Sequence, residues 1–499
     1  MSRTTWLVLG LLTLLAFGTW AAWSFTVDDA FITFRYSANL AEGNGPVWNV
    51  GDDPVEGFTN FAWMIWHALF VSFGFDPALV AKVTSLVIAV GTLAMLLRAT
   101  EGAGRIVAGA AYVVFLPTYF HLAGGLETVA FAAAVLRMAA IGVRVIEGRR
   151  VFDWEPPLLL LLAGMLRPEG LLAALPGFVV WFWYARDDRL VRLYTGIAAV
   201  LGVGYFGWRW IYYGHPLPNT FYVKFGNLTA GWDWTERTLL LFAPLLVLTV
   251  LLLVWKDLRA TGLLLCSTVV TTCATYALSG PSMDYLHRFA YHVYPVLCLG
   301  AGLAVGALTH RWLTAAVGVA AVGGTAVTGA IAPDLPVIAN YGADLRRAHV
   351  AIGQGLAETG VDPEFETLAV GDAGAIPYYS GWRTIDYIGL NDEAIAHGDD
   401  PTDVVRQARP TVVILTSNSA EAPEELYGLR AAEATAGYTH IAAVQMRAGY
   451  WQHVFAVPGW APQIRSALTP AVDQAQRTHD PGRYELTIDR WLDGLRTGR

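Results

Sequence analysis

Long apolar runs recur along the first two thirds of the chain, and they limit its fold more than any other feature. A helix of about 20 apolar residues can cross the hydrocarbon core of a membrane, because its backbone hydrogen bonds are all made within the segment. Hydrophobic residues make up 55% of the chain and charged residues only 15%, which is unlike an ordinary soluble protein. We expect about eleven membrane spans, at residues 6–25, 78–97, 105–121, 125–144, 156–167, 170–185, 192–212, 238–255, 260–279, 288–308 and 312–332.

Basic residues between the predicted spans indicate which ends face the cytoplasm. With the amino terminus inside, every inner loop carries arginine or lysine, which is the positive-inside pattern. No small-residue cleavage site follows the first run, so we expect an uncleaved helix rather than a signal peptide. The apolar stretch 58–75 would break the alternation as a span, and we expect it to be a helix on the outer surface. An odd number of spans then places residues 333–499 outside the cytoplasmic membrane.

The composition changes from apolar to mixed after residue 332. We therefore expect a transmembrane domain at 1–332, with its first outer loop at 26–77, and a small extracytoplasmic domain at 333–499. In the latter, helical periodicity at 341–358 precedes short β-type runs at 366–372, 383–389, 411–417 and 439–447. The predicted fold is a mainly α, polytopic helix bundle with a C-terminal α/β domain. The net charge of −8 and the lack of a basic cluster argue against nucleic acid as a partner.

Unusual polar residues gather in the predicted outer loops, at the depth of the lipid headgroups. Two adjacent acids, Asp28 and Asp29, open the first of these loops. Glu56 lies in the same loop, and the remaining loops contribute Glu127, Arg167, Glu169, Asn219, Lys224, His287 and Arg288. A carboxylate can act as a base for a hydroxyl acceptor, and cations can bind a lipid-borne phosphate. Their concentration at one membrane face therefore indicates a transfer reaction at that face.

The motifs around these residues resemble a known superfamily. They are DDAFITFRYSANLAEGNGPVWN at 28–49, EGFTNFAW at 56–63, GGLETVAF at 124–131, LRPEGLL at 166–172, PLPNTFY at 216–222 and GDAGAIPYYSGWRTIDYIGLND at 371–392. In this order they resemble the GT-C superfamily of integral-membrane glycosyltransferases. The nearest likeness is to the terminal β-(1→2)-arabinofuranosyltransferases of the mycobacterial cell wall and to related pilin arabinosyltransferases.

The resemblance implies a reaction and its partners. A sugar, here arabinofuranose, would pass with inversion from a polyprenyl-phosphate donor such as decaprenyl-phospho-arabinose to a cell-envelope glycan or glycoprotein acceptor. The reaction would take place on the outer face of the cytoplasmic membrane, among its lipids. The resemblance favours Asp28 as the catalytic base, with Asp29 orienting the site.

Each candidate residue also has a structural interpretation. Asp28 and Asp29 precede an amphipathic helix, and acids stabilise a helix start by accepting hydrogen bonds from its free N–H groups. One acid suffices for that purpose, so the second favours a base on a rigid helix start. The expected donor-phosphate ligands are Lys224, Arg288, His287 and Arg167. Long basic side chains also extend toward the interface at helix ends, and Arg167 can instead pair internally with Glu169.

A further set of residues is expected to bind the sugar or the acceptor. These residues are Glu56, Glu127, Asn219 and Asp372. Capping of a turn is the alternative for Glu56 and Glu127. Paired carboxylates can hold a divalent metal, but no third ligand accompanies Asp28 and Asp29, so no cofactor is assigned and a metal remains possible.

Two other functional classes fit the composition less well. A lipid or sugar transporter or flippase is the main alternative, but it should show internal repeats and helices broken at the membrane midplane, and the sequence shows neither. A sensor with an outer binding domain would leave the acids and cations of several outer loops without a role. We therefore favour a glycosyltransferase.

Overall fold

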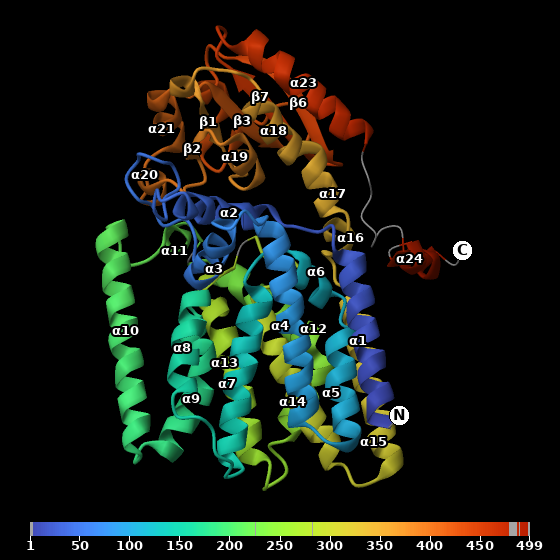
Figure 1. The fold of residues 1–499 in the computed structure, drawn as a ribbon. Helices are drawn as coiled ribbons and strands as arrows, with labels where there is room; N and C mark the ends of the chain where they lie inside the picture. The colour runs from blue at the N-terminus through green and yellow to red at the C-terminus, as the bar shows by residue number, and fades with distance from the viewer. Residues whose placement is uncertain (1–2, 225, 282, 479–486, 489, 498–499) are drawn as a thin grey trace.

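Long helices form a bundle that makes up most of the structure. The computed structural model describes residues 3–478 except 225 and 282, together with residues 487–488 and 490–497. Within these residues, seven helices are long and apolar enough to cross a membrane. They are α1 (Arg3–Ala22), α4 (Pro77–Ala99), α7 (Thr128–Ile146), α10 (Arg189–Tyr213), α12 (Leu228–Leu251), α13 (Arg259–Ser279) and α15 (Arg311–Ala330). The expected multi-pass helix bundle is confirmed (Figure 1).

The remaining predicted spans form shorter or broken helices. Three are single apolar helices, α8 (Glu155–Leu166), α9 (Gly170–Ala185) and α14 (Tyr294–Ala307), the last preceded by a 3-10 turn at Tyr291–Val293. The span predicted at 105–121 is broken into two helices, α5 (Gly102–Val114) and α6 (Pro117–Ala123), which meet at an angle of 62°. Pro117 starts α6 and has no N–H, so it cannot extend the hydrogen bonding of α5.

The connections that carry the basic residues lie at one end of the bundle. Figure 1 shows the amino terminus there, together with the α4–α5, α7–α8, α9–α10 and α14–α15 connections. The sheet lies beyond the opposite end. This separation agrees with the topology expected from the positive-inside pattern, while the side that each end faces stays a prediction.

Short helices cover the end of the bundle next to the sheet. α2 (Asp28–Ala41) and α3 (Phe61–Val71) lie across it, and α11 (Asn219–Lys224), α16 (Leu335–Ile338) and α17 (Tyr341–Leu345) are also found there. The surface helix expected at 58–75 is thus present as α3. α2 is amphipathic in sequence but buried on most sides, because α3 packs on one side and the C-terminal region on another.

The C-terminal region is an α/β fold around a mixed five-stranded sheet. Its strands are β1 (Thr367–Val370), β2 (Arg383–Asp386), β3 (Val412–Ser417), β6 (Thr439–Arg447) and β7 (Tyr450–Ala456), in the order β2-β1-β3-β7-β6. β1 pairs in parallel with β2 and β3, whereas β7 is antiparallel to β3 and β6. The four predicted β runs are confirmed. The sequence did not indicate β7, where the polar side chains of Gln452 and His453 are buried.

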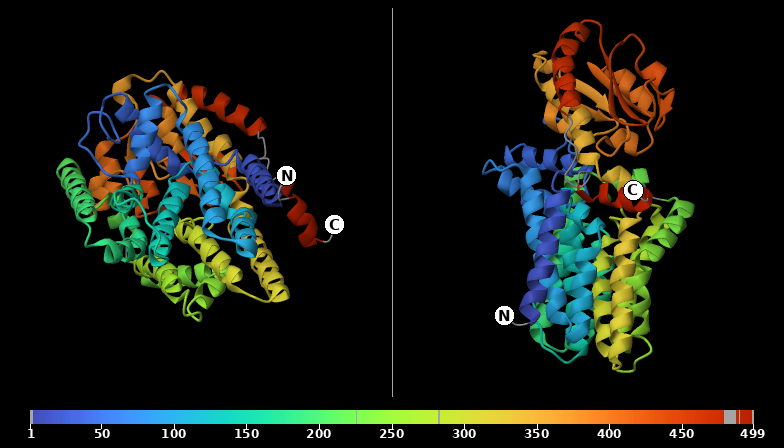
Figure 2. Two further views of the ribbon diagram at one scale, coloured as in Figure 1. Left: turned by 60° about the horizontal axis from the view of Figure 1, so that its bottom comes forward. Right: turned by 90° about the vertical axis from the view of Figure 1, so that its right-hand side faces the viewer.

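Helices surround this sheet, and the remaining elements are short. The helices are α18 (Ala351–Ala357), which continues a π-turn at Arg346–Val350, α19 (Ala375–Ser380), α20 (Glu393–Ala396), α21 (Pro401–Ala408) and α23 (Ala461–Arg477). The smaller elements are a 3-10 turn at Pro363–Phe365, β4 (Glu425–Leu426), β5 (Leu429–Arg430), α22 (Ala431–Ala434) and α24 (Arg490–Thr497). A second view shows the sheet and its helices above the same end of the bundle (Figure 2).

The α/β region docks on the first loop, residues 26–77, through hydrogen bonds to backbone carbonyls. The buried Arg35 guanidinium donates to the carbonyl oxygens of Pro377 at 2.6 Å and Trp382 at 2.9 Å. The Trp48 indole donates to the Thr384 carbonyl at 3.1 Å. Buried hydrogen bonds of this kind require a fixed geometry, so the α/β region and the first loop are packed as one unit.

The predicted topology can be tested by cysteine labelling in intact cells. In a background without native cysteines, Ser419→Cys should react with a membrane-impermeant maleimide, because this exposed residue lies in the α/β region. Asp187→Cys, in the exposed α9–α10 connection, should react only after the cells are permeabilised. The opposite pattern would invert the topology.

Candidate functional site

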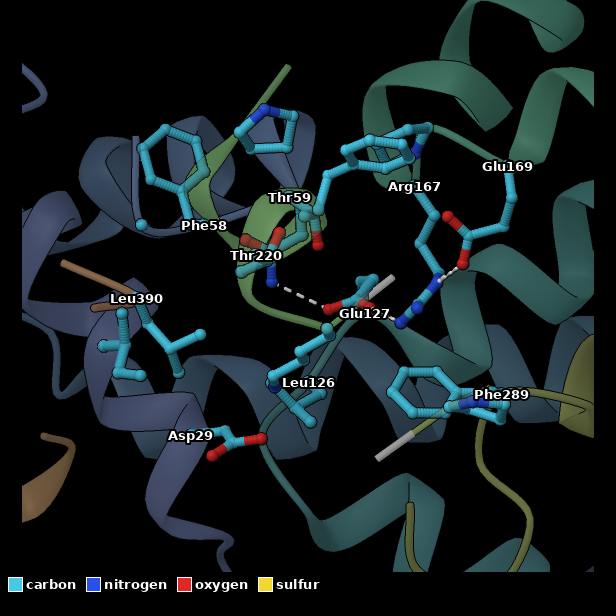
Figure 3. A pocket seen from close by; sticks show the side chains of 18 of the residues that line it. Asp29, Phe58, Thr59, Leu126, Glu127, Arg167, Glu169, Thr220, Phe289 and Leu390 are labelled. Atoms are coloured by element: carbon cyan, nitrogen blue, oxygen red, sulfur yellow. Dashed lines mark hydrogen bonds and ion pairs between the residues drawn. The ribbon is translucent and has the colours of Figure 1, made fainter. Parts of the chain in front are cut away.

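A cavity of about 240 Å³ lies where the bundle meets its covering helices. It is lined by α2, α11, the loops before α3 and α7, the α8–α9 turn, the end of α13 and the segment after it. Leu390, from the loop after β2, also lines it. Five segments that the sequence analysis placed at one membrane face therefore converge here, and the α/β region completes the wall (Figure 3).

One charged group in the cavity consists of Asp29, Arg288 and Lys224. An Arg288 nitrogen, Nη2, lies 2.9 Å from Asp29 Oδ2, and the two side chains are 6% and 31% exposed. Burial would raise the pKa of Asp29, but the positive charges of Arg288 and Lys224 hold it below its usual value. Asp29 is therefore an ionised carboxylate inside a largely enclosed site.

Backbone geometry places Arg288 against Asp29. Leu286 and His287 both have left-handed backbone conformations, with φ of 48° and 53°. Such conformations cost non-glycine residues about 1 kcal/mol or more and persist where the surroundings fix them. Here the Leu286 N–H donates to Asp334 Oδ2 at 3.2 Å and the Arg288 N–H donates to the Tyr285 carbonyl at 3.0 Å.

A second charged group consists of Glu127, Arg167 and Glu169. Arg167 Nη1 lies 2.7 Å from Glu127 Oε1, and its Nε lies 2.5 Å from Glu169 Oε1. The Asn60 amide donates to Glu127 Oε2 at 2.7 Å, and the Tyr276 hydroxyl donates to Glu169. Figure 3 shows Arg167 between the two glutamates, with Asp29 on the other side of the view.

Asp28 lies outside the cavity, although it is adjacent to Asp29 in sequence. Its two oxygens accept the backbone N–H groups of Gly374 at 3.1 Å and Ala375 at 2.8 Å, at the start of α19. Burial raises the pKa of Asp28 to about 6, against the nearby positive charge of His349. Asp28 was predicted as the catalytic base, with capping of its own helix as the alternative, but it binds the start of a helix of the α/β region instead.

Glu56 and Asn219 lie near the cavity but do not line it. Glu56 is buried 3.3 Å from Arg209 Nη1, and burial raises its pKa to about 7 despite that cation. The Asn219 backbone N–H donates to the Glu56 carbonyl at 3.1 Å, while its neighbours Pro218 and Thr220 line the cavity. Both residues thus fix the segment that leads into α11 and Lys224.

His287 and Asp372 also lie apart from the cavity lining. The His287 ring is hydrogen-bonded to Thr238 of α12 at 2.8 Å. Asp372 follows β1, where it pairs with His349 at 2.9 Å and accepts hydrogen bonds from Tyr450 and Gln452. Of the predicted ligands, Asp29, Glu127, Arg167, Lys224 and Arg288 line the cavity, whereas Asp28, Glu56, Asn219, His287 and Asp372 do not.

The lining residues that were not predicted as ligands include Thr33, Asn60, Tyr276 and Leu390. Thr33 follows Asp29 by one helical turn and donates to Asn60 Oδ1 at 3.2 Å, so the spacing could have indicated it. Asn60 lies within one of the motifs quoted above. Leu390 also lies within a quoted motif, at 371–392, but its entry into the cavity depends on docking between distant parts of the chain.

The acids do not form a shared metal site. Asp28 and Asp29 face different partners: Asp28 accepts a backbone hydrogen bond from Gly374, and Asp29 pairs with the Arg288 guanidinium. Among the described residues, no group of three or more His, Cys, Asp or Glu side chains is placed to hold a metal. The sequence assigned no cofactor to these acids, and we derive no step through a metal ion.

Comparisons with solved structures identify the fold. ArnT from Cupriavidus metallidurans bound to undecaprenyl phosphate has a TM-score of 0.62 and 15% identity, covering 92% of this chain and 99% of ArnT. The apo state of ArnT gives a TM-score of 0.61 with 14% identity and the same coverage. The chain has the GT-C fold. The fold implied by the sequence motifs is thus confirmed.

A second GT-C structure matches over part of its length. The arabinofuranosyltransferase AftD from Mycobacteria has a TM-score of 0.51 and 14% identity, covering 92% of this chain and 40% of AftD. A family model described as a domain of unknown function, DUF8728, matches residues 339–455 of the α/β region. No curated protein matches the chain.

Contact between Asp28 and α19 can be tested with two glycine substitutions. A Cβ on Gly374 would lie 2.1 Å from the Asp28 carbonyl oxygen, whereas a Cβ on Gly459 would meet nothing within 4 Å. Gly374→Ala should lower stability by about 1 to 3 kcal/mol through forced separation of the two regions. It should therefore lower the thermal unfolding midpoint and expose the α/β region to protease, while Gly459→Ala should behave like the wild type. Equal behaviour of the two variants would contradict the docking contact.

Proposed function

We propose that this protein is an inverting glycosyltransferase that takes a sugar from a polyprenyl-phosphate donor. The observation that carries the proposal is an ionised aspartate, Asp29, beside Arg288 and Lys224 in a cavity at one end of a GT-C helix bundle. These are the groups needed to accept a proton and to bind a departing phosphate. Undecaprenyl phosphate bound to ArnT, a protein of the same fold, supports the donor class.

Asp29 is the general base in this proposal. An acceptor hydroxyl attacks the anomeric carbon of the donor sugar, its proton passes to an Asp29 carboxylate oxygen, and the bond from that carbon to the phosphate oxygen breaks. The bonding electrons leave with the polyprenyl phosphate, and attack from the opposite side inverts the anomeric centre. Asp28 is unsuited to this step, because both of its oxygens accept backbone hydrogen bonds from α19.

Arg288 and Lys224 are the proposed phosphate ligands. Arg288 Nε is buried and has no hydrogen-bond partner among the described residues, so it is free to donate to a phosphate while Nη2 holds Asp29. The charge that develops on the leaving phosphate is stabilised by preorganised cations in a site that excludes most water. Arg167 is not assigned this role, because Glu127 and Glu169 already bind it.

The finer assignments rest on the sequence motifs. We propose arabinofuranose as the sugar, which the motifs and the similarity to AftD both support. The proposed acceptor is a cell-envelope glycan or protein. The reaction would occur at the outer face of the cytoplasmic membrane, with residues 333–499 outside, as the distribution of basic loops favours.

The general base can be identified with Asp-to-Asn substitutions assayed with polyprenyl-phosphate arabinose. Asp29→Asn should lower transfer by roughly 10² to 10⁴-fold, since an amide cannot take the acceptor's proton. Asp28→Asn should lose far less activity and act mainly on stability. Asp76→Asn is the matched control, because Asp76 is an exposed cap of α4 that Asn can replace. If Asp28→Asn abolishes transfer and Asp29→Asn does not, Asp28 is the base.

Phosphate binding can be tested with alanine substitutions at the two cations. Arg288→Ala and Lys224→Ala should each weaken donor binding by about 1.5 to 3 kcal/mol, or roughly tenfold and more, through loss of a charge-assisted hydrogen bond. Lys256→Ala is the control, since Lys256 is exposed in the connection between α12 and α13. Affinity for undecaprenyl phosphate, measured with purified protein in detergent, would show this. Wild-type affinity in both cavity variants would show that the phosphate binds at another site.

A further inference from the structure

The two charged groups that line the cavity differ in net charge. Arg288 and Lys224 outnumber Asp29 in one group, whereas Glu127 and Glu169 outnumber Arg167 in the other. The Phe289 ring contacts both groups, with its centre 4.7 Å from the Arg288 guanidinium and 4.8 Å from that of Arg167. The cavity therefore has a cationic part and an anionic part that meet at Phe289.

Every nitrogen of Arg167 already has a partner, and both carboxylates of this group bind it. Its Nη1 and Nε bind the two glutamates, and its Nη2 lies 3.5 Å from the Tyr276 hydroxyl. The three side chains are 12%, 3% and 17% exposed for Arg167, Glu127 and Glu169. Burial would raise the pKa of Glu169, but Arg167 and the Tyr276 hydroxyl hold it below its usual value. This part of the cavity therefore keeps an excess of carboxylate oxygens.

Carboxylate oxygens accept hydrogen bonds and cannot donate them, so this surface suits a ligand rich in hydroxyl groups. A carboxylate on the sugar would be buried beside the negative charges of Glu127 and Glu169. Arg167, the cation of this group, is already paired with both glutamates. The size of the cavity, about 240 Å³, sets a second limit. Ligand sites usually measure roughly 300 to 1,000 Å³, so this space favours a small ligand such as one sugar ring over an oligosaccharide.

We propose that the cavity accepts a donor with a single, non-acidic sugar ring, whose hydroxyl groups bind Glu127 and Glu169 while its phosphate lies at Arg288 and Lys224. The two glutamates thereby select against sugars with an acidic substituent. This inference rests on the proposed glycosyltransferase function and adds the two glutamates that select the sugar.

Binding of three synthetic short-chain polyprenyl phosphates to the purified full-length protein tests the inference. The first probe has no sugar, the second has a neutral pentofuranose and the third has a uronic acid. In the wild type, the uronic acid probe should bind about tenfold or more weakly than the neutral one, because of like-charge repulsion in a buried site. Equal binding of these two probes would overturn the inference and leave the proposed donor class intact.

A charge-neutral variant makes the test specific to this group. Glu169→Gln should reduce the difference between the uronic acid and neutral probes severalfold, because one of the opposing charges is removed. Glu155→Gln is the matched control, since Glu155 also pairs with an arginine, Arg137 at 2.6 Å, but lies outside the cavity lining. It should leave the difference unchanged. Because the probes are compared within one variant, a general loss of folded protein affects all probes alike and does not change the difference between them.

Two further outcomes distinguish this inference from the proposed function. If Glu169→Gln leaves the wild-type difference between the probes unchanged, the selection does not come from this group and the inference fails. If none of the three probes binds the wild type, and Arg288→Ala changes nothing, the donor class itself is wrong. The inference then falls with the proposed function.

Discussion

Two neighbouring carboxylates at the start of α2 face opposite parts of the molecule, and the site depends on this separation. Asp28 accepts the backbone N–H groups at the start of α19, while Asp29 pairs with Arg288 in the cavity. Burial of a carboxylate lowers stability unless the carboxylate is paired or hydrogen-bonded. Each of the two acids therefore requires the partner that it has. Through α2, docking of the α/β region is therefore linked to the position of Asp29.

That link gives the α/β region a direct part in the site. Arg35 and Trp48 hold it on the first loop, and Leu390 from the loop after β2 forms part of the cavity wall. The helix bundle supplies the cations and acids at its end, where burial strengthens their interactions. The proposed transfer reaction uses this division: the bundle holds phosphate and sugar, and the α/β region encloses them.

Local sequence patterns predicted the elements better than the contacts between them. Apolar length predicted the helices, but not the bend that Pro117 introduces between α5 and α6. Charge and motif predicted that Asp29, Glu127, Arg167, Lys224 and Arg288 would meet, because all were expected at one membrane face. The distinct positions of Asp28 and Asp29, and the entry of Leu390, depend on packing between residues far apart in sequence. The hydrophobic periodicity of the sequence does not predict such contacts.

The central claim is that Arg288 and Lys224 hold the donor phosphate while Asp29 faces the reacting sugar. The most direct measurement is a cryo-EM structure of the Asp29→Asn variant with a polyprenyl-phosphate pentofuranose. We predict phosphate density about 3 Å from the Arg288 and Lys224 nitrogens, with the sugar against Glu127 and Glu169 and its anomeric carbon toward residue 29. Phosphate bound at Arg167, or a sugar placed at Asp28 and Asp372 instead, would contradict the account.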